Sequence, residues 1–252
     1  MARYDFHTPE PVELDVRIPA GDVKIETVDG DESTVVVEGS DKLVEQTTVE
    51  LVGNRLVVEL RTKILSGITL SIGDFSFGGS KLDIRVRIPH ASRAALGTAA
   101  ADMELRGRYA ALEVKSAAGD VVVDGEIAGD AEIKTVSGDV RLRSVGGELR
   151  VQTVSGDVTA ASVGCDITAK SVSGDVRVES AREGHVTVQS VSGDIEVGVA
   201  PGTNLDVAAG SVSGDLSSEV ALGSDAGNLG DGPTLVVRGK TVSGDFKVFR
   251  AA

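Results

Sequence analysis

A nine-residue period in the middle of the chain constrains the fold more than any other feature. The tetrapeptide Val-Ser-Gly-Asp recurs there, and its copies begin at Val136, Val154, Val172 and Val191. Successive copies are 18, 18 and 19 residues apart, and a looser turn such as Gly146-Gly147-Glu148 lies midway between them. A fixed period of this kind is the signature of a repeat architecture, in which each unit buries its apolar face against its neighbours.

Apolar and polar residues alternate after each turn. In one such unit, Val140 and Leu142 alternate with Arg141 and Arg143. A period of two is typical of a β-strand with one buried face. We therefore predict an all-β fold, a single-stranded β-solenoid built from strand-turn units of about nine residues, with two units in each coil of about 18 residues. The predicted interior residues are Val140, Leu142, Leu149, Val151, Val158, Ile167, Val176, Val178, Val186, Val188, Ile195 and Val197.

The rest of the chain is predicted to extend this solenoid. Residues 1–97 form an N-terminal β-rich part that is continuous with the solenoid or caps it, and the turn at Gly53-Asn54 is typical of a hairpin. Residues 98–252 carry the solenoid repeats, with a loop inserted at 221–233. No segment shows a sustained helical period, so we expect almost no α-helix.

The composition is consistent with a thin aliphatic core. The chain has 31 glycines, no tryptophan and 3% aromatic residues. Bulky rings suit the ends of a stack of coils, where an open edge must be covered. Phe246 and Phe249, close to the C-terminus, are therefore expected to cap the last coil.

The net charge argues against two classes of partner. The chain has 39 acidic and 25 basic residues, a formal charge of −14. Nucleic acid and anionic membranes both require clustered positive charge, so neither is an expected partner. The single cysteine allows no internal disulfide, and no apolar run has the length of a signal-peptide core or of a membrane span. We therefore expect a cytoplasmic protein.

The repeated aspartates are the sharpest candidate site. One Asp per coil places them in a column with a spacing of about 4.8 Å, and its members are Asp139, Asp157, Asp175 and Asp194. Two neighbouring carboxylates repel by roughly 1 kcal/mol in water and by about 3–4 kcal/mol at an effective dielectric constant of 20. Either Ca²⁺ bridges successive turns, or each Asp accepts hydrogen bonds from turn N–H groups and Ser hydroxyls while facing water. We favour the second interpretation, in which the column binds no metal.

No catalytic or cofactor site is predicted. His7, His90 and His185 are scattered, with no pair at the spacing of metal ligands. The repeated serines have no recurring histidine, and a lone thiol at a turn, Cys165, is more typical of an incidental cysteine than of a nucleophile. We expect no enzyme activity, no cofactor and no small-molecule ligand.

Residues 63–80 interrupt the pattern with an apolar segment rich in Gly and Ser. We predict that this segment faces a protein partner, a second copy of the chain or the end of the stack. The alternative, which we favour, is that Phe75 and Phe77 simply cap the solenoid core. The predicted partner-facing residues are Ile68, Leu70, Ile72, Phe75 and Phe77.

The recurring Ser-Gly-Asp-Val/Ile units, few aromatics and strand-rich start resemble the bacterial "putative adhesin" β-strand-repeat family, also called toastrack. The resemblance implies a non-enzymatic β-solenoid module, which in some relatives accompanies envelope-stress systems. We expect a scaffold that binds a protein or itself. The alternative, a calcium-dependent or glycan-binding adhesin-like module, would require exposed aromatic rows for sugar stacking. The predicted outward residues contain none; they are Arg141, Arg143, Thr159, Ala161, Thr168, Lys170, Arg177, Glu179, Thr187 and Gln189.

Overall fold

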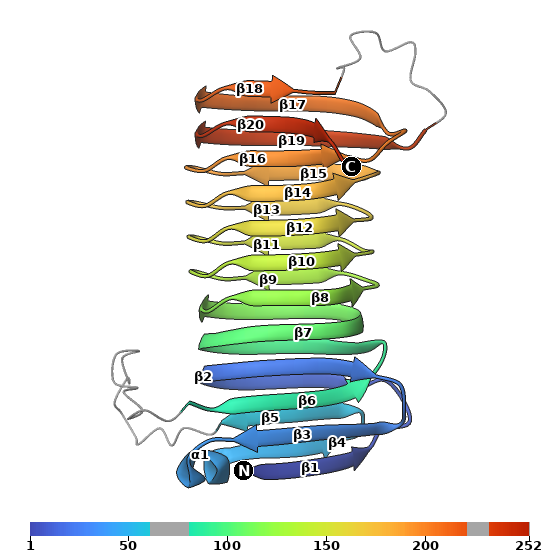
Figure 1. Cartoon of the computed structure of the whole chain (residues 1–252), viewed down its shortest axis with the longest axis vertical. Coiled ribbons are helices and arrows are strands. Elements are labelled where there is room, and N and C mark those ends of the chain that lie inside the picture. Colours follow the sequence, from blue (N-terminus) through green and yellow to red (C-terminus); the bar gives the residue numbers. More distant parts are fainter. Residues whose placement is uncertain (61–80, 221–231, 252) are drawn as a thin grey trace.

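The computed structural model describes residues 1–60, 81–220 and 232–251, and these form one elongated stack of β-coils (Figure 1). The strands lie across the long axis, and the N-terminal strand lies at the end opposite β17 and β18. The predicted β-solenoid is therefore confirmed. The insertion predicted at 221–233 lies almost entirely outside the described residues, as do residues 63–80.

Two parallel stacks of strands form the regular part of the solenoid. Within each stack the partner residues are one coil apart, as in the pairs Val140–Val158 and Val158–Val176. The first stack contains β8 (Val121–Ile127), β10 (Val140–Val145), β12 (Val158–Val163), β14 (Val176–Ala181), β16 (Ile195–Val199), β20 (Phe246–Arg250) and β18 (Leu216–Ser218). The second contains β9 (Ala131–Lys134), β11 (Leu149–Gln152), β13 (Ile167–Lys170), β15 (Gly184–Gln189), β19 (Thr234–Ser243) and β17 (Asn204–Ser213).

The long strands β2 (Glu13–Val28) and β7 (Ser92–Ala118) bend around the solenoid and continue both stacks toward the N-terminal end. β7 runs through residue 97 without a break. The next coil is made of β5 (Arg55–Leu60) and β6 (Asp83–Pro89), which pair in parallel with β2.

Antiparallel strands finish the N-terminal end. β4 (Thr47–Val52) pairs with β5, as the turn at Gly53-Asn54 predicts, while β3 (Glu32–Glu38) pairs with β6 and β1 (Ala2–His7) with β3. A short helix, α1 (Asp41–Gln46), inserts Leu43 into the core. The sequence did not predict this helix, because six residues are too few to show a helical period.

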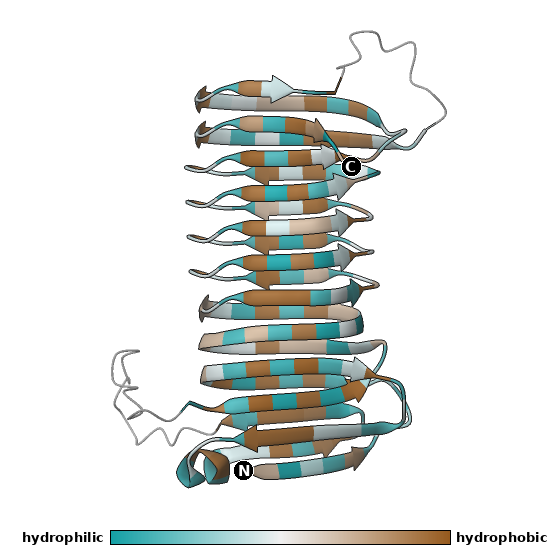
Figure 2. Ribbon diagram, in the orientation of Figure 1, coloured by the Kyte–Doolittle hydropathy of each residue, from teal (hydrophilic) through white to brown (hydrophobic). Residues whose placement is uncertain are grey.

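The core lies between the two stacks and follows the predicted alternation. All twelve predicted interior residues are buried, with at most 3% of their surface exposed. Apolar and polar residues alternate along most strands in Figure 2. Because each coil carries few apolar side chains, every coil depends on its two neighbours for burial.

The turn glycines are required by close contact between coils. Gly156 has φ of 126°, a value that L side chains rarely adopt. A Cβ at this position would lie 2.2 Å from the carbonyl oxygen of Gly138 in the preceding coil. Only glycine therefore allows the backbone of one turn to stack directly on the next.

The C-terminal coils are not stacked in sequence order. The chain leaves β16, forms β17 and β18 at the far end, and returns so that β19 lies between β15 and β17 and β20 between β16 and β18. The expectation that Phe246 and Phe249 cap the last coil is therefore wrong. Phe246 is buried inside the stack, and the Phe249 ring lies against the Arg177 guanidinium, 5.2 Å from its centroid.

Candidate interaction surfaces

The aspartate column runs along one corner of the solenoid and is joined by hydrogen bonds between coils. The backbone N–H of each Asp donates to Oδ1 of the Asp in the neighbouring coil, at 3.1 Å from Asp157 to Asp139 and 2.9 Å from Asp175 to Asp157. The same bond joins Asp194 to Asp175 and Asp245 to Asp194, each at 2.8 Å. The column thus brings together all four predicted aspartates, and the bonds run between coils rather than within one turn.

These bonds give each carboxylate a structural role. The turn interrupts the regular strand ladder, and the aspartate side chain supplies the acceptor that the next backbone N–H would otherwise lack. The opposite corner repeats the device with other residues, since Asp166 Oδ1 accepts from the backbone N–H of His185 at 2.7 Å. Among the described residues, no group of three or more His, Cys, Asp or Glu side chains has an arrangement that could hold a metal ion.

An exposed column of valines lies beside the aspartate turns. The Val of each Val-Ser-Gly-Asp unit is exposed. The serine that follows it pairs with the serine of the next coil, so the valines lie in register along the solenoid. Six such coils make an apolar ridge about 24 Å long at the usual strand spacing. The members of this valine column are Val136, Val154, Val172, Val191, Val242 and Val212, of which the first five are 46–52% exposed and the last 83%.

A row of lysine and glutamine side chains runs parallel to the valine column. Strand pairing places Lys134, Gln152, Lys170, Gln189 and Lys240 side by side on consecutive coils. Lys134 forms an ion pair with Glu132. In the part of the chain that the structure describes, Lys170 and Lys240 form no ion pair, so two cations remain available on a chain of net charge −14.

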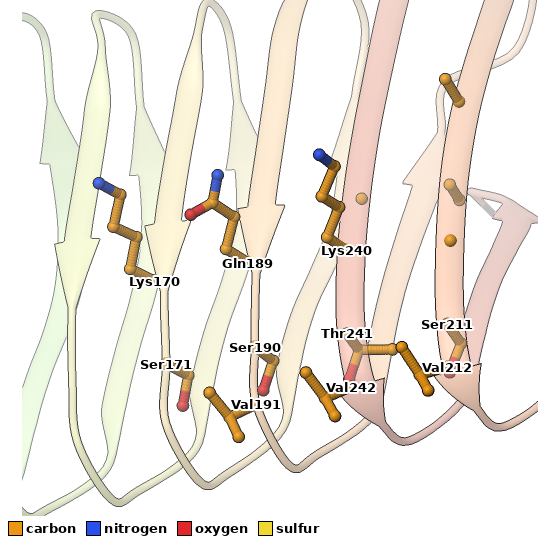
Figure 3. Close-up of a pocket in the computed structure, with 14 residues that line it drawn as sticks. Lys170, Ser171, Gln189, Ser190, Val191, Ser211, Val212, Lys240, Thr241 and Val242 are labelled. Atoms are coloured by element: carbon orange, nitrogen blue, oxygen red, sulfur yellow. The ribbon is translucent and has the colours of Figure 1, made fainter.

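A groove of about 880 Å³ lies between the lysine row and the valine column. In Figure 3 the side chains of Lys170, Gln189 and Lys240 line one side, and Val191, Val242 and Val212 line the other. Between these two sides lie the small residues Ser171, Ser190, Thr241 and Ser211, of which the first three are buried. We call these residues together the groove face. It offers apolar contact and positive charge over several coils.

The other sequence candidates do not gather into a site. Ile68, Leu70, Ile72, Phe75 and Phe77 lie outside the described residues. Cys165 is exposed at a turn, and His185 lies on the surface beside Asp166, with 3.4 Å between His185 Nδ1 and Asp166 Oδ1. Among the described residues, the one helix, α1, has neither the length nor the apolar character to cross a bilayer.

Comparison with known families decides the classification. The family model Toastrack DUF4097 matches residues 12–249 of the chain. The chain belongs to the toastrack family. No curated protein sequence matches this toastrack chain.

Two solved structures share the toastrack fold described above. A "putative adhesin" from Bacteroides fragilis has 15% sequence identity and a TM-score of 0.58, with 98% of this chain and 96% of that chain covered. A second "putative adhesin", from Parabacteroides distasonis, has 13% identity and a TM-score of 0.54, with the same coverage of 98% and 96%. At these identities the likeness establishes the fold alone.

The groove face of this toastrack protein was missed in the sequence, although the signal was present. Val151 points inward and Gln152 outward, so continuing the alternation places Thr153 inside and Val154 outside. The alternation of each strand thus continues into the turn that follows it. The sequence could not show the groove itself, because its depth depends on the bend of the backbone between the strand and the turn.

Proposed function

We propose that the protein is a non-enzymatic β-solenoid scaffold whose groove face binds a partner protein. The partner contributes an extended segment that carries apolar and acidic side chains. The observation that supports this proposal is the exposed valine column beside Lys170 and Lys240, neither of which forms an ion pair among the described residues. Isolated exposed apolar residues are ordinary on protein surfaces, whereas a contiguous apolar patch marks an interaction site.

Charge and shape favour a protein segment over other partners. An acidic segment is attracted to the lysine row, and rim charges of this kind set partner choice and association rate. The groove crosses consecutive coils, so an extended segment contacts several valines at once. The link to envelope-stress systems is also part of the proposal and rests on the family resemblance, while a cytoplasmic location rests on the sequence alone.

The calcium-dependent or glycan-binding alternative has weaker support. Each aspartate of the column already uses one carboxylate oxygen to accept a backbone N–H, as Asp157 does from Asp175. Sugar recognition would use exposed aromatic faces, but the ring of Phe249 is covered by Arg177.

Site-specific crosslinking tests the proposal. A photoreactive amino acid in place of Val191, on the groove face, is compared with one at Ala161, which lies on the other stack. We expect position 191 to crosslink to one partner through an acidic segment. The crosslink should be lost in Lys170→Glu/Lys240→Glu and at high salt, because screening weakens attraction between exposed charges. Equal crosslinking from both positions, or capture of a basic segment, would contradict the proposal.

A further inference from the structure

The C-terminal end of the solenoid differs from every other coil. β17 and β18 form the outermost coil, and among the described residues each pairs with one strand, β17 with β19 and β18 with β20 (Figure 1). Backbone N–H and C=O groups alternate in direction along a strand, so half of those in β17 point away from β19. Among the described residues, this end therefore presents a sheet edge over residues 205–213.

The core is unfinished at this edge. Leu216 lies in register with Phe246, which in turn lies in register with Ile195. Phe246 is 2% exposed and Ile195 0%, but Leu216 is 54% exposed. In the other stack, Leu205 and Val207 are only partly buried, while their partners Leu235 and Val237 are fully buried. In the part of the chain that the structure describes, no further coil covers these inward-facing apolar side chains.

The two ends of the solenoid differ in how their sheet edges are protected. At the N-terminal end, α1 covers the core with Leu43, and the short edge strand β1 carries the charged pair Arg3 and Asp5. Charged side chains, short strands and covering helices are the usual means of preventing edge-to-edge pairing. β17 and β18 have a single charged residue, Asp206, and it forms an ion pair with Arg238 of the adjacent strand.

We propose that this edge pairs with the same edge of a second copy of the chain, in a two-fold symmetric, tail-to-tail dimer. An isologous contact requires a surface that complements itself, and the contact closes after two copies. Within residues 205–211, two antiparallel β17 strands satisfy the backbone groups that point away from β19. Each copy also covers the unfinished core of the other, including Leu205, Val207 and Leu216.

The sequence of β17 fits this symmetry. Directly opposed residues in an antiparallel pair point to the same face. A two-fold axis at Ala208 therefore sets Ala208 opposite Ala208 of the second copy, Val207 opposite Ala209, and Asp206 opposite Gly210. The small residues at the centre allow the two backbones to approach. The two Asp206 carboxylates do not face each other, so this register brings no like charges together.

Charge-swap variants at Ala208 test the dimer, because this exposed residue lies at the proposed axis. Like charges directly opposite each other destabilise strand pairing. We expect the wild type to sediment as a dimer, and Ala208→Lys and Ala208→Glu each to sediment as folded monomers. An equimolar mixture of the two variants should form a heterodimer again. Since misfolding of a variant would not be repaired by mixing, this rescue separates the interface from stability.

A matched control places the same charge on another strand of the same stack. Thr187→Lys adds this charge on β15. Thr187 pairs with Arg238 of β19, which in turn pairs with Ala208 of β17. Because β15 lies away from the proposed interface, this variant should leave the dimer intact. A wild-type monomer at all concentrations would overturn the proposal, as would open-ended polymers, which indicate head-to-tail contacts. So would a β17 edge that pairs only with a different protein, or a mixture of charge variants that stays monomeric.

Discussion

The backbone N–H of Asp157 donates a hydrogen bond of 3.1 Å to the side chain of Asp139, and Asp157 in turn accepts one of 2.9 Å from Asp175. Each aspartate is therefore both donor and acceptor in a chain of bonds that joins the coils. Hydrogen bonds to a charged acceptor contribute about 1.5–3 kcal/mol, which is comparable with the repulsion between neighbouring carboxylates at a partly exposed site. We therefore expect the column to be stable without a cation.

The first prediction separates the acceptor from the charge. Asp157→Ala removes the acceptor for the N–H of Asp175, so we expect a loss of about 1 kcal/mol in the free energy of unfolding. Asp157→Asn keeps a side-chain oxygen and removes one like charge from the column, so its stability should equal or exceed that of the wild type. Urea unfolding of both variants measures the difference. Equal losses in the two would show that the charge itself is required.

The second prediction concerns calcium. A ligand that binds only the folded protein raises the melting temperature, because it stabilises by RT ln(1 + [L]/Kd). We expect melting temperatures with chelator and with millimolar Ca²⁺ to agree within about a degree. The matched variant is Asp157→Asn/Asp175→Asn. A larger shift in the wild type that this variant abolishes would instead identify the column as a calcium site.

The strand pattern accounts for most of the fold, because strand period and turn chemistry are local properties. The alternation at Val140 and Leu142 correctly predicts which side chains are buried. The alternation does not predict burial correctly at the ends of the solenoid, where burial depends on which coils lie next to each other. Leu216 has the same local pattern as Ile195 but is exposed, because β19 and β20 insert beneath the last coil. A strand does not encode in its own residues which coil will lie beside it.

The third prediction concerns the turn glycines. Gly156→Ala meets both an unfavourable φ of 126° and a contact of 2.2 Å with the Gly138 carbonyl oxygen. Gly30 has a similar φ of 133°, but nothing lies within 4 Å of its added Cβ. Gly30→Ala should therefore cost about 1–3 kcal/mol from backbone strain alone, and Gly156→Ala clearly more. Equal costs in thermal unfolding would mean that the coils can separate freely.

The fourth prediction concerns alkaline pH. Tyr109 is buried, and its hydroxyl donates to the carbonyl oxygens of Ile25 at 2.9 Å and Arg106 at 3.1 Å. Burial raises the pKa of this phenol above its usual value of about 10. Its contribution to stability is complete below that value and is lost as pH rises further, because the unfolded chain releases the proton first.

Tyr109→Phe should therefore flatten the alkaline decline in stability, at a cost of about 0.5–1.5 kcal/mol at neutral pH from the lost hydrogen bond. Tyr4→Phe, at the other tyrosine, serves as the control. Urea unfolding across a pH series measures both effects. An alkaline decline as steep in Tyr109→Phe as in the wild type would assign it to other groups.

The last prediction concerns Asp22, which lies between Asp83 and Asp102 on the adjacent strands. Burial raises the pKa of its carboxyl, and a hydrogen bond with Asp83 and repulsion from Asp83 and Asp102 add to the rise, whereas Lys81 opposes it. A carboxyl whose pKa is higher in the folded state than in the unfolded state favours folding most when protonated. That benefit is complete below the unfolded-state value of about 3.9 and is lost as pH rises through the folded-state value.

Replacing Asp22 by Asn should therefore stabilise the protein at neutral pH, and the gain should shrink as the solution is acidified. Asp206→Asn is the matched control, because Asp206 is exposed and forms an ion pair with Arg238. Its loss should lower stability slightly, by about 0–1 kcal/mol, which is the opposite sign. If Asp22→Asn instead destabilises the protein at neutral pH, the carboxylate is ionised and held by Lys81, whose Nζ lies 3.9 Å from Asp22 Oδ2.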